Sequence, residues 1–112
     1  MEVHRALGPG FLESIYKSAL LHELDLRGIA ARSEWEVHVL YKDRVIGKHR
    51  LDIIVGEEVI VELKAVSGIA PVHVAQTLSY MKATGIPLAL IINFGEPSLA
   101  WKRLVKSRPN NP

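Results

Sequence analysis

A pair of apolar segments on either side of residues 56–58 constrains this chain more than any other feature. The first segment reads DIIV and the second VIVELKAV. Two strand-like runs joined by a short, glycine-containing loop predict an antiparallel hairpin. The hairpin carries charges where such strands are normally apolar, namely Asp52 in its first strand and Glu62 and Lys64 in its second. Charges in these places are unfavourable unless they are exposed, paired or bound to another group.

The expected register brings these charges together. Side chains alternate along a strand, so Glu62 and Lys64 project to the same side. If Val55 pairs with Val59 across a three-residue loop, Asp52 lies directly opposite Glu62, where like charges are destabilising. A loop one residue longer or shorter would place the two acids on opposite faces of the sheet.

Two explanations are open at this point. The acids could lie on a solvated sheet face, with Lys64 offsetting their charge. However, Ile60 lies on the face of Glu62 and Ile54 lies beside Asp52, which indicates a covered face. Two carboxylates on a covered face need a cation between them, and hard oxygen ligands select Mg²⁺, Mn²⁺ or Ca²⁺. A lysine beside such a cluster suits phosphoryl chemistry.

The rest of the chain predicts an α/β fold. Residues 10–28 have helical spacing and end at a glycine, and a second helix begins at Pro71 and ends at Gly85. A short helix is expected at 2–7, and strands at 34–41, 45–55, 59–66, 87–94 and 99–105. This order predicts a three-stranded antiparallel meander, a helical crossover and a mixed sheet covered by helices, with the last strand at an edge.

Length and composition indicate a single globular domain. The chain has 112 residues, of which 48% are hydrophobic and 23% charged. We expect one domain at 1–106 and a disordered tail at 107–112. No apolar run approaches the roughly 20 residues that span a bilayer. Without cysteine, disulfides and thiolate metal sites are excluded, and the cytoplasm is the expected location.

The charged residues of the hairpin resemble a known signature. Asp52 followed by Glu62, Leu63 and Lys64 resembles the D…(D/E)-x-K pattern of the PD-(D/E)XK nuclease superfamily. The predicted element order is similar to the αβββαβ restriction-endonuclease-like core of that superfamily. Leu51 stands where the superfamily signature has proline, a departure that puts little in doubt.

Two helix motifs extend the resemblance. Gly10, Glu13 and Tyr16 match a G-x-x-E-x-x-Y pattern, and Gln76 and Tyr80 match the Q-x-x-x-Y pattern of recombination nucleases. With the segments VHRALGPG and INFG, they make the chain similar to the GxxExxY protein family over nearly its whole length.

The resemblance implies a role for each motif residue. Asp52 and Glu62 would bind Mg²⁺ or Mn²⁺, with the Leu63 carbonyl as a further ligand and Glu13 reaching the metal from the first helix. Lys64 would position the attacking water. The plainer alternatives are a solvated helix carboxylate for Glu13 and an ion pair with an acid for Lys64.

The second helix would add Gln76 and Tyr80, which lie on one helix face and would contact the water, the phosphate or a base. A tyrosine in such a helix is also a common packing residue. Basic residues near the C-terminus are candidates for phosphate contacts: Lys102, Arg103, Lys106 and Arg108.

The leading hypothesis is therefore a metal-dependent nuclease that hydrolyses DNA or RNA, with DNA as the expected partner. The resemblance implies 5′-phosphate and 3′-hydroxyl products. The alternative is an inactive module of the same fold that binds nucleic acid or a partner and keeps its acids as a structural ion network. The net charge of +2 neither demands nor excludes nucleic acid. Because the domain offers little surface for gripping a duplex, a homodimer is one assembly to test.

Overall fold

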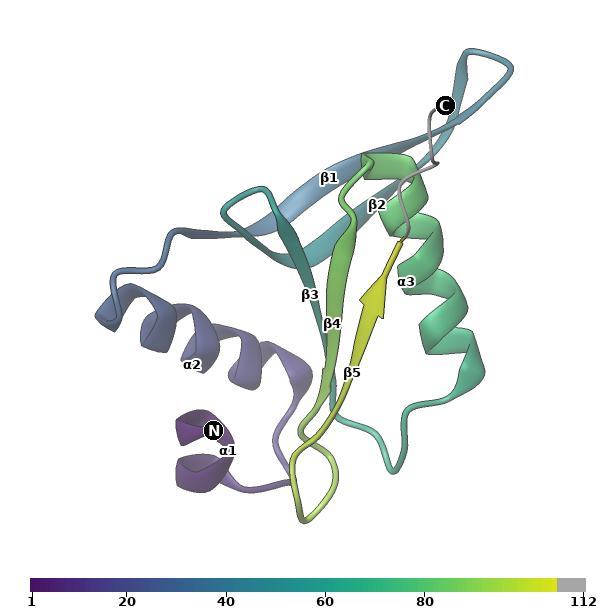
Figure 1. Ribbon diagram of the computed structural model, residues 1–112. Coiled ribbons are helices and arrows are strands. Elements are labelled where there is room, and N and C mark those ends of the chain that lie inside the picture. Colours follow the sequence, from purple (N-terminus) through teal and green to yellow (C-terminus); the bar gives the residue numbers. More distant parts are fainter. Residues whose placement is uncertain (107–112) are drawn as a thin grey trace.

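The computed structural model describes residues 1–106, which form a mixed five-stranded sheet with helices on both faces (Figure 1). The elements are α1 (Glu2–Leu7), α2 (Glu13–Leu26), β1 (Ala31–Tyr41), β2 (Arg44–Val55), β3 (Val59–Lys64), α3 (Pro71–Thr84), β4 (Leu88–Asn93) and β5 (Ala100–Val105). The strands lie in sequence order, with β1 and β5 at the edges. Only β3 and β4 are parallel. The predicted α/β class, consistent with a restriction-endonuclease-like core, is confirmed. The tail expected at 107–112, and Arg108 within it, lie outside the described residues.

Both long helices end at the predicted glycines. Gly28 has a φ of 70°, and the N–H of Ile29 bonds the Leu24 carbonyl at 2.9 Å, as in a Schellman motif. Pro71 opens α3 and Gly85, with a φ of 75°, follows its last turn. No helix in the described part of the chain has both the length and the apolar character needed to cross a membrane.

Two tight turns set the register of the meander. Lys42 and Asp43, with φ values of 48° and 65°, both adopt the left-handed conformation that a two-residue hairpin turn requires. In the second hairpin Val55 pairs with Val59, and the N–H of Glu58 bonds the Val55 carbonyl at 3.1 Å. The three-residue loop predicted from the sequence is thus confirmed, and with it the register that sets the two acids opposite each other.

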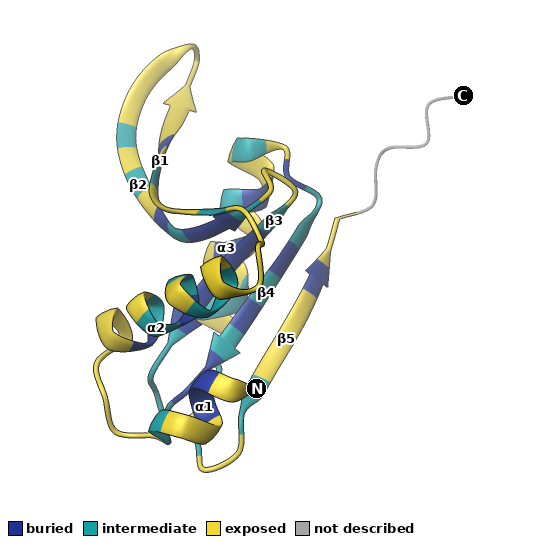
Figure 2. Cartoon of the chain, turned by 90° about the vertical axis from the view of Figure 1, so that its left-hand side faces the viewer, coloured by how far each residue is buried: buried dark blue, intermediate teal, exposed yellow. Residues whose placement is uncertain are grey.

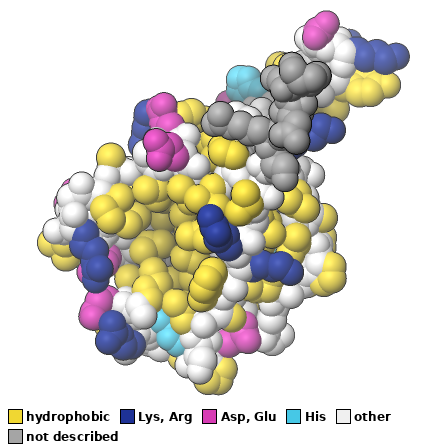
Figure 3. All heavy atoms as spheres, viewed as in Figure 1, with side chains coloured by type: hydrophobic (Ala, Val, Ile, Leu, Met, Phe, Trp, Pro, Cys, Tyr) yellow, Lys and Arg dark blue, Asp and Glu magenta, His cyan; other side chains and the backbone are white. Residues whose placement is uncertain are grey.

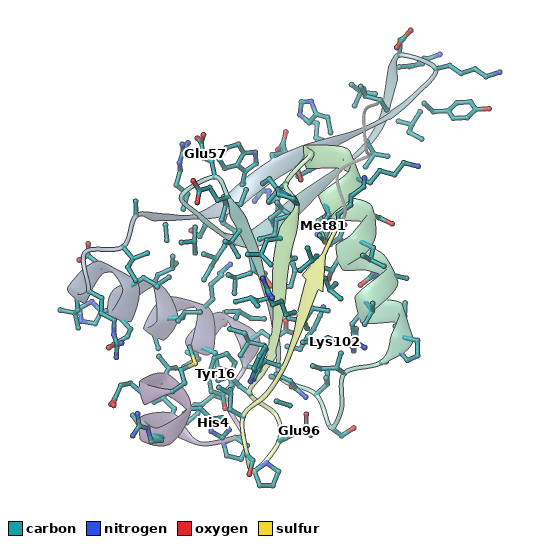
Figure 4. All side chains as sticks on the ribbon, viewed as in Figure 1. His4, Tyr16, Glu57, Met81, Glu96 and Lys102 are labelled. Atoms are coloured by element: carbon teal, nitrogen blue, oxygen red, sulfur yellow. The ribbon has the colours of Figure 1, made fainter. Side chains whose placement is uncertain are left out.

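Each face of the sheet has its own core. Figure 4 shows Tyr16 on the side of α2 and Met81 on the opposite side, in α3. The core under α1 and α2 contains Val3, Tyr16, Leu20, Ile53, Val61, Leu63 and Phe94. The core under α3 contains Val37, Leu51, Ile54, Ile60, Met81, Ile86, Ala89, Ile91 and Leu104. Leu51 and Ile53 belong to different cores although they are two residues apart, so the alternation of β2 breaks at Asp52.

Two strand ends differ from the prediction by two residues or more. β1 begins at Ala31 rather than at residue 34, because Ala31 pairs with Val55. β3 ends at Lys64 rather than at Val66. Beyond Lys64 the Val66 N–H donates to Asn93 Oδ1 at 3.0 Å, and Asn93 Nδ2 donates to the Val66 carbonyl at 2.9 Å. The Asn93 side chain thus satisfies the Val66 N–H and carbonyl, the backbone groups that would otherwise continue the strand pairing of β3.

The far ends of β1 and β2 project from the body of the molecule, where Figure 2 shows them mostly exposed. We call residues 38–48 the arm; all of them except Gly47 are exposed. Trp35 and Val37 lie in or against the α3 core, as their spacing predicts, but Val39 on the same face is 41% exposed.

Candidate active site

Two carboxylates meet where β2 separates from β3. The ladder between these strands ends at the pair of Ile53 and Val61, so the next step places Asp52 across from Glu62. The Leu63 N–H donates to Asp52 Oδ2 at 2.8 Å, and the Asp52 N–H approaches Glu62 Oε1 at 3.4 Å. The two carboxylate side chains therefore stand where the next backbone hydrogen bonds of the β2–β3 ladder would otherwise form. The structure brings the two predicted acids together.

The pair is electrostatically unfavourable as two charged groups. Glu62 is only 5% exposed, whereas Asp52 is half-buried. Burial, and after it the negative charge of Asp52, raises the pKa of Glu62 from 4.5 to about 8, although the positive charge of Lys64 acts in the opposite direction. At neutral pH the pair therefore retains a proton unless a cation takes its place.

The donor atoms at this point fit a hard divalent cation. The Leu63 N–H points at Asp52, and its carbonyl faces the same way because both groups of a strand residue point to one neighbouring strand. Residues 1–106 contain no group of three His, Cys, Asp or Glu side chains placed to hold a metal. An ion here would be held by Asp52, Glu62, the Leu63 carbonyl and water.

Lys64 lies two residues beyond Glu62 on the same face, at the end of β3. Its carbonyl accepts the Phe94 N–H at 2.8 Å, which fixes the backbone, and its side chain is partly buried. Among the described residues, Lys64 forms no ion pair within 4.0 Å. The Lys64 ammonium group is thus available to interact with a further charged group that comes close to Asp52 and Glu62.

Helix α3 places one of its two predicted residues beside the acids. Burial, and then the charges of Glu62 and Asp52, raise the pKa of Tyr80, so this phenol lies within the field of the pair. Gln76 shares the helix face of Tyr80, one turn closer to the start of α3, and is exposed. It forms no side-chain hydrogen bond within the described part of the chain.

His49 is a neighbour of the site that the sequence reasoning missed. Its ring stacks on Tyr80, with centroids 3.9 Å apart and planes inclined by 13°. Burial lowers its pKa, while Asp52 raises it and Lys64 lowers it further, so the imidazole is close to both. The only signal in the sequence is its position three residues before Asp52 on the same strand.

The structure does not bring Glu13 to the acids. This residue is exposed in the first turn of α2, and α2 packs against the sheet face opposite to Tyr80. Figure 1 shows α2 and α3 on opposite sides of the sheet. The role of Glu13 as a ligand stays a prediction, and in this arrangement it would require water or a rearrangement of the helix start.

The tyrosine of the first motif has a structural role. Tyr16 is fully buried and stacks on Phe94, with centroids 4.5 Å apart. Its hydroxyl donates to the Gly8 carbonyl at 2.5 Å and accepts the Phe11 N–H at 3.1 Å. One side chain thus ties the loop between α1 and α2 to the sheet.

The segment INFG supports the chain just beyond Lys64. Besides its bonds to Val66, Asn93 donates to Glu96 Oε2 at 2.8 Å. A Cβ on Gly95 would lie 2.3 Å from the Val66 carbonyl oxygen, so only glycine fits without a shift of the backbone. Figure 4 shows Glu96 near His4, whose Nε2 donates to the Glu96 carbonyl at 3.0 Å. These contacts hold the end of β3 in place behind the site.

The described basic residues of β5 lie away from the acids. Lys102 pairs with Ile91, which in turn pairs with Glu62, so Lys102 is two strands, or about 10 Å, from the acid. Ile91 is fully buried between them, and Arg103 projects to the opposite face. Neither is part of the cluster around Asp52.

Comparison with known proteins agrees with this arrangement. A family model described as the PD-(D/E)XK nuclease superfamily matches residues 1–104. The crystal structure of SSO0001 has a similar fold, with a TM-score of 0.63 and 18% sequence identity over 85% of this chain. The match covers 50% of the SSO0001 chain, so the present chain spans about half of its length. No curated protein matches. The extent of the family match shows that this chain belongs to the PD-(D/E)XK nuclease superfamily.

Proposed function

We propose that the chain is a divalent-metal-dependent phosphodiesterase that hydrolyses nucleic acid, with DNA as the expected substrate and Mg²⁺ or Mn²⁺ as the cofactor. The observation that carries the proposal is the approach of Glu62 to Asp52 on a covered face, where burial, and after it the charge of Asp52, raises the pKa of Glu62 to about 8. A fold without need of a cation would gain stability by replacing one of these acids. Membership of the PD-(D/E)XK nuclease superfamily supports phosphodiester hydrolysis as the class of reaction.

The position of each residue in the site indicates its role in the proposed reaction. Asp52, Glu62 and the Leu63 carbonyl would hold the ion. The chemistry that a divalent ion supplies when bound is polarisation of the phosphate and acidification of water. Lys64 would orient the attacking water or offset the charge that develops on the phosphate, because it lies on the face of Glu62 and has no ion-pair partner among residues 1–106. Tyr80 would contact the water or the phosphate.

Gln76 and Glu13 would complete the site at its rim. Gln76 is exposed one turn from Tyr80, where it can meet the substrate, and Glu13 would act through water. We also propose that the chain belongs to the GxxExxY branch of the superfamily, which its first motif supports. Cytoplasmic location is part of the same proposal, and the absence of cysteine agrees with it.

A metal-free binding module is the competing function. It is favoured by one observation: the Leu63 N–H donates to Asp52 Oδ2 at 2.8 Å, and a proton retained through the raised pKa of Glu62 would satisfy the pair without an ion. Titration calorimetry with Mg²⁺ and Mn²⁺ distinguishes the two. A catalytic site binds the ion and loses this binding in the Glu62→Gln variant, whereas a metal-free ion network shows no binding heat in either protein.

Cleavage assays test the proposal directly. Circular and linear DNA and RNA, single- and double-stranded, are incubated with the protein and Mg²⁺ or Mn²⁺. We expect cleavage by the wild type, a loss of about 100-fold or more in Lys64→Ala, and unchanged cleavage in Lys102→Ala, a matched variant outside the cluster. Equal cleavage by the wild type and Lys64→Ala would identify a contaminant and contradict the proposal.

A further inference from the structure

The aromatic pair of His49 and Tyr80 joins two elements that carry parts of the site. His49 belongs to β2, which also carries Asp52, and Tyr80 belongs to α3. Their ring centroids are 3.9 Å apart and their planes are inclined by 13°, so the two rings overlap face to face. Both side chains are half-buried, which leaves part of each ring in contact with solvent. The stack thus connects the strand of Asp52 to the ring of Tyr80.

Glu62 faces α3 rather than α2. It pairs with Ile91 across β3 and β4, and Ile91 belongs to the core under α3, so both side chains lie on that side of the sheet. On the side of the molecule seen in Figure 3, by contrast, apolar side chains occupy the middle and acidic ones lie toward the border. Burial, and then the charges of Glu62 and Asp52, raise the pKa of Tyr80, which places this phenol close to any ligand that the two acids hold.

The hydroxyl of Tyr80 is not held by the protein itself. Two hydrogen bonds fix the hydroxyl of Tyr16, whereas among residues 1–106 the hydroxyl of Tyr80 forms none. The Tyr80 ring packs against the border of the α3 core and stays partly exposed. A hydroxyl without a protein partner is free to bond an incoming ligand. Where it meets that ligand depends on what holds the ring.

His49 is placed to hold that ring. Its strand partner is the buried Val37 of β1, so the backbone beneath the imidazole is fixed. Within the described part of the chain the imidazole forms neither a hydrogen bond nor an ion pair. The stack on Tyr80 is therefore the specific interaction that the structure gives this side chain.

We propose that His49 is a positioning residue of the site, whose ring holds the Tyr80 phenol where its hydroxyl can donate to a phosphate oxygen of the nucleic acid. The inference rests on the proposed function, because that function supplies the phosphate. His49 acts through Tyr80, so another aromatic ring at residue 49 serves the same purpose, and the ring nitrogen atoms of His49 are not required.

A double-mutant cycle on cleavage tests this role. Tyr80→Phe keeps the stack but removes the hydroxyl, and should lower cleavage about tenfold, which corresponds to the loss of one hydrogen bond. His49→Ala should lower cleavage by a similar factor, and the double variant no further than Tyr80→Phe alone, because both changes remove the same contact. Losses that add in the double variant would overturn the proposal.

An aromatic replacement separates positioning from direct chemistry by the imidazole. His49→Phe should retain cleavage within about twofold of the wild type, because the new ring can stack on Tyr80. His38→Ala, the matched control at an exposed histidine of the arm, should leave cleavage unchanged. If His49→Phe is as impaired as His49→Ala, the imidazole acts itself and the positioning role is wrong.

Fluorine NMR gives a result that needs neither cleavage nor metal. The chain has three tyrosines, so protein labelled with 3-fluorotyrosine should give three signals, and Tyr80→Phe identifies one of them. In His49→Ala the Tyr80 signal should move toward that of the exposed Tyr41, whereas in His49→Phe it should remain distinct from it. The signal of the buried Tyr16 reports whether each variant is folded. A Tyr80 signal that is unchanged in His49→Ala would overturn the proposal.

The two experiments distinguish failure of this inference from failure of the proposed function. If the wild type neither cleaves nucleic acid nor binds a divalent ion, the proposed function fails, and with it the contact of the phenol with a phosphate. If the wild type cleaves but the Tyr80 signal does not respond to His49→Ala, the positioning role fails alone. Should the Tyr16 signal show that His49→Ala is unfolded, His49→Gln, which has no ring, takes its place in both experiments.

Discussion

Strands β1 and β2 run through both the body of the molecule and its arm, but their contacts differ almost completely between the two regions. At Leu51–Val55, β2 lies within the sheet, and Leu51 and Ile53 are fully buried in opposite cores. At Arg44–Lys48 the same strand is almost fully exposed. Asp52 lies in the first of these regions, opposite Glu62, whose pKa is raised by burial. The comparison shows that strand geometry alone does not make a site, because the covering helices supply the desolvation.

The largest difference between body and arm is expected from truncating one isoleucine in each. Ile53→Ala removes a fully buried side chain and should lower the free energy of unfolding by about 2–5 kcal/mol. Ile46→Ala, at 63% exposure, should change it by no more than about 0.5 kcal/mol in the monomer. Urea denaturation at low protein concentration measures both. Similar losses would mean that the arm is packed against the body in solution.

The sequence predicted those parts of the fold and site that depend on local signals. The glycine of the second hairpin loop and the apolar alternation around it set the register of Val55 and Val59, and this register alone brings Asp52 opposite Glu62. Gly85 ended α3 for a similarly local reason, since its left-handed conformation excludes most other residues.

Contacts between distant segments were not predictable in this way. The stack of His49 on Tyr80 depends on where α3 crosses the sheet, and no spacing along the chain encodes that position. The exposure of Val39 likewise depends on how far the covering elements reach. Its alternation with Val37 is that of a buried face, but α3 covers Val37 and not Val39.

The second largest effect concerns the pH dependence of stability. Burial raises the pKa of Glu62 from 4.5, its ordinary value in water, to about 8 in the folded chain, so between these pH values the folded state retains a proton that the unfolded state has lost. Stability should therefore fall as the pH rises from about 4.5 to 8, by an amount on the order of a few kcal/mol. Thermal unfolding at several pH values checks this slope.

Glu62→Gln should flatten the slope, because the amide does not titrate, and Asp43→Asn in the arm should leave it unchanged. Saturating Mg²⁺ should stabilise the wild type most at the upper end of this range, since binding requires the deprotonated acid. A wild-type slope equal to that of Glu62→Gln would show that Glu62 is not desolvated.

Two glycines give the next contrast. Gly95→Ala drives a methyl group against the Val66 backbone and should cost about 1–3 kcal/mol, with a shift of the segment beyond Lys64. Gly47→Ala in the arm meets no atom within 4 Å, and replacing glycine in a strand should stabilise the chain by about 0.5–1 kcal/mol. Chemical denaturation of the two variants should give changes of opposite sign. Losses of equal size would contradict the close packing assigned to Gly95.

The smallest contrast is between His49, the first residue after the arm, and His38 within it. His49→Ala removes the stack on Tyr80 and should cost about 1 kcal/mol, while His49→Phe should retain most of the stability because an aromatic ring can occupy the same place. His38→Ala breaks only an exposed contact with Glu36 and should have no measurable effect on stability. NMR adds a structural readout, because the ring current of Tyr80 shifts the carbon-bound protons of His49. If Tyr80→Leu leaves those shifts unchanged, the two rings do not stack in solution, and Tyr80 must be held beside the acids by α3 alone.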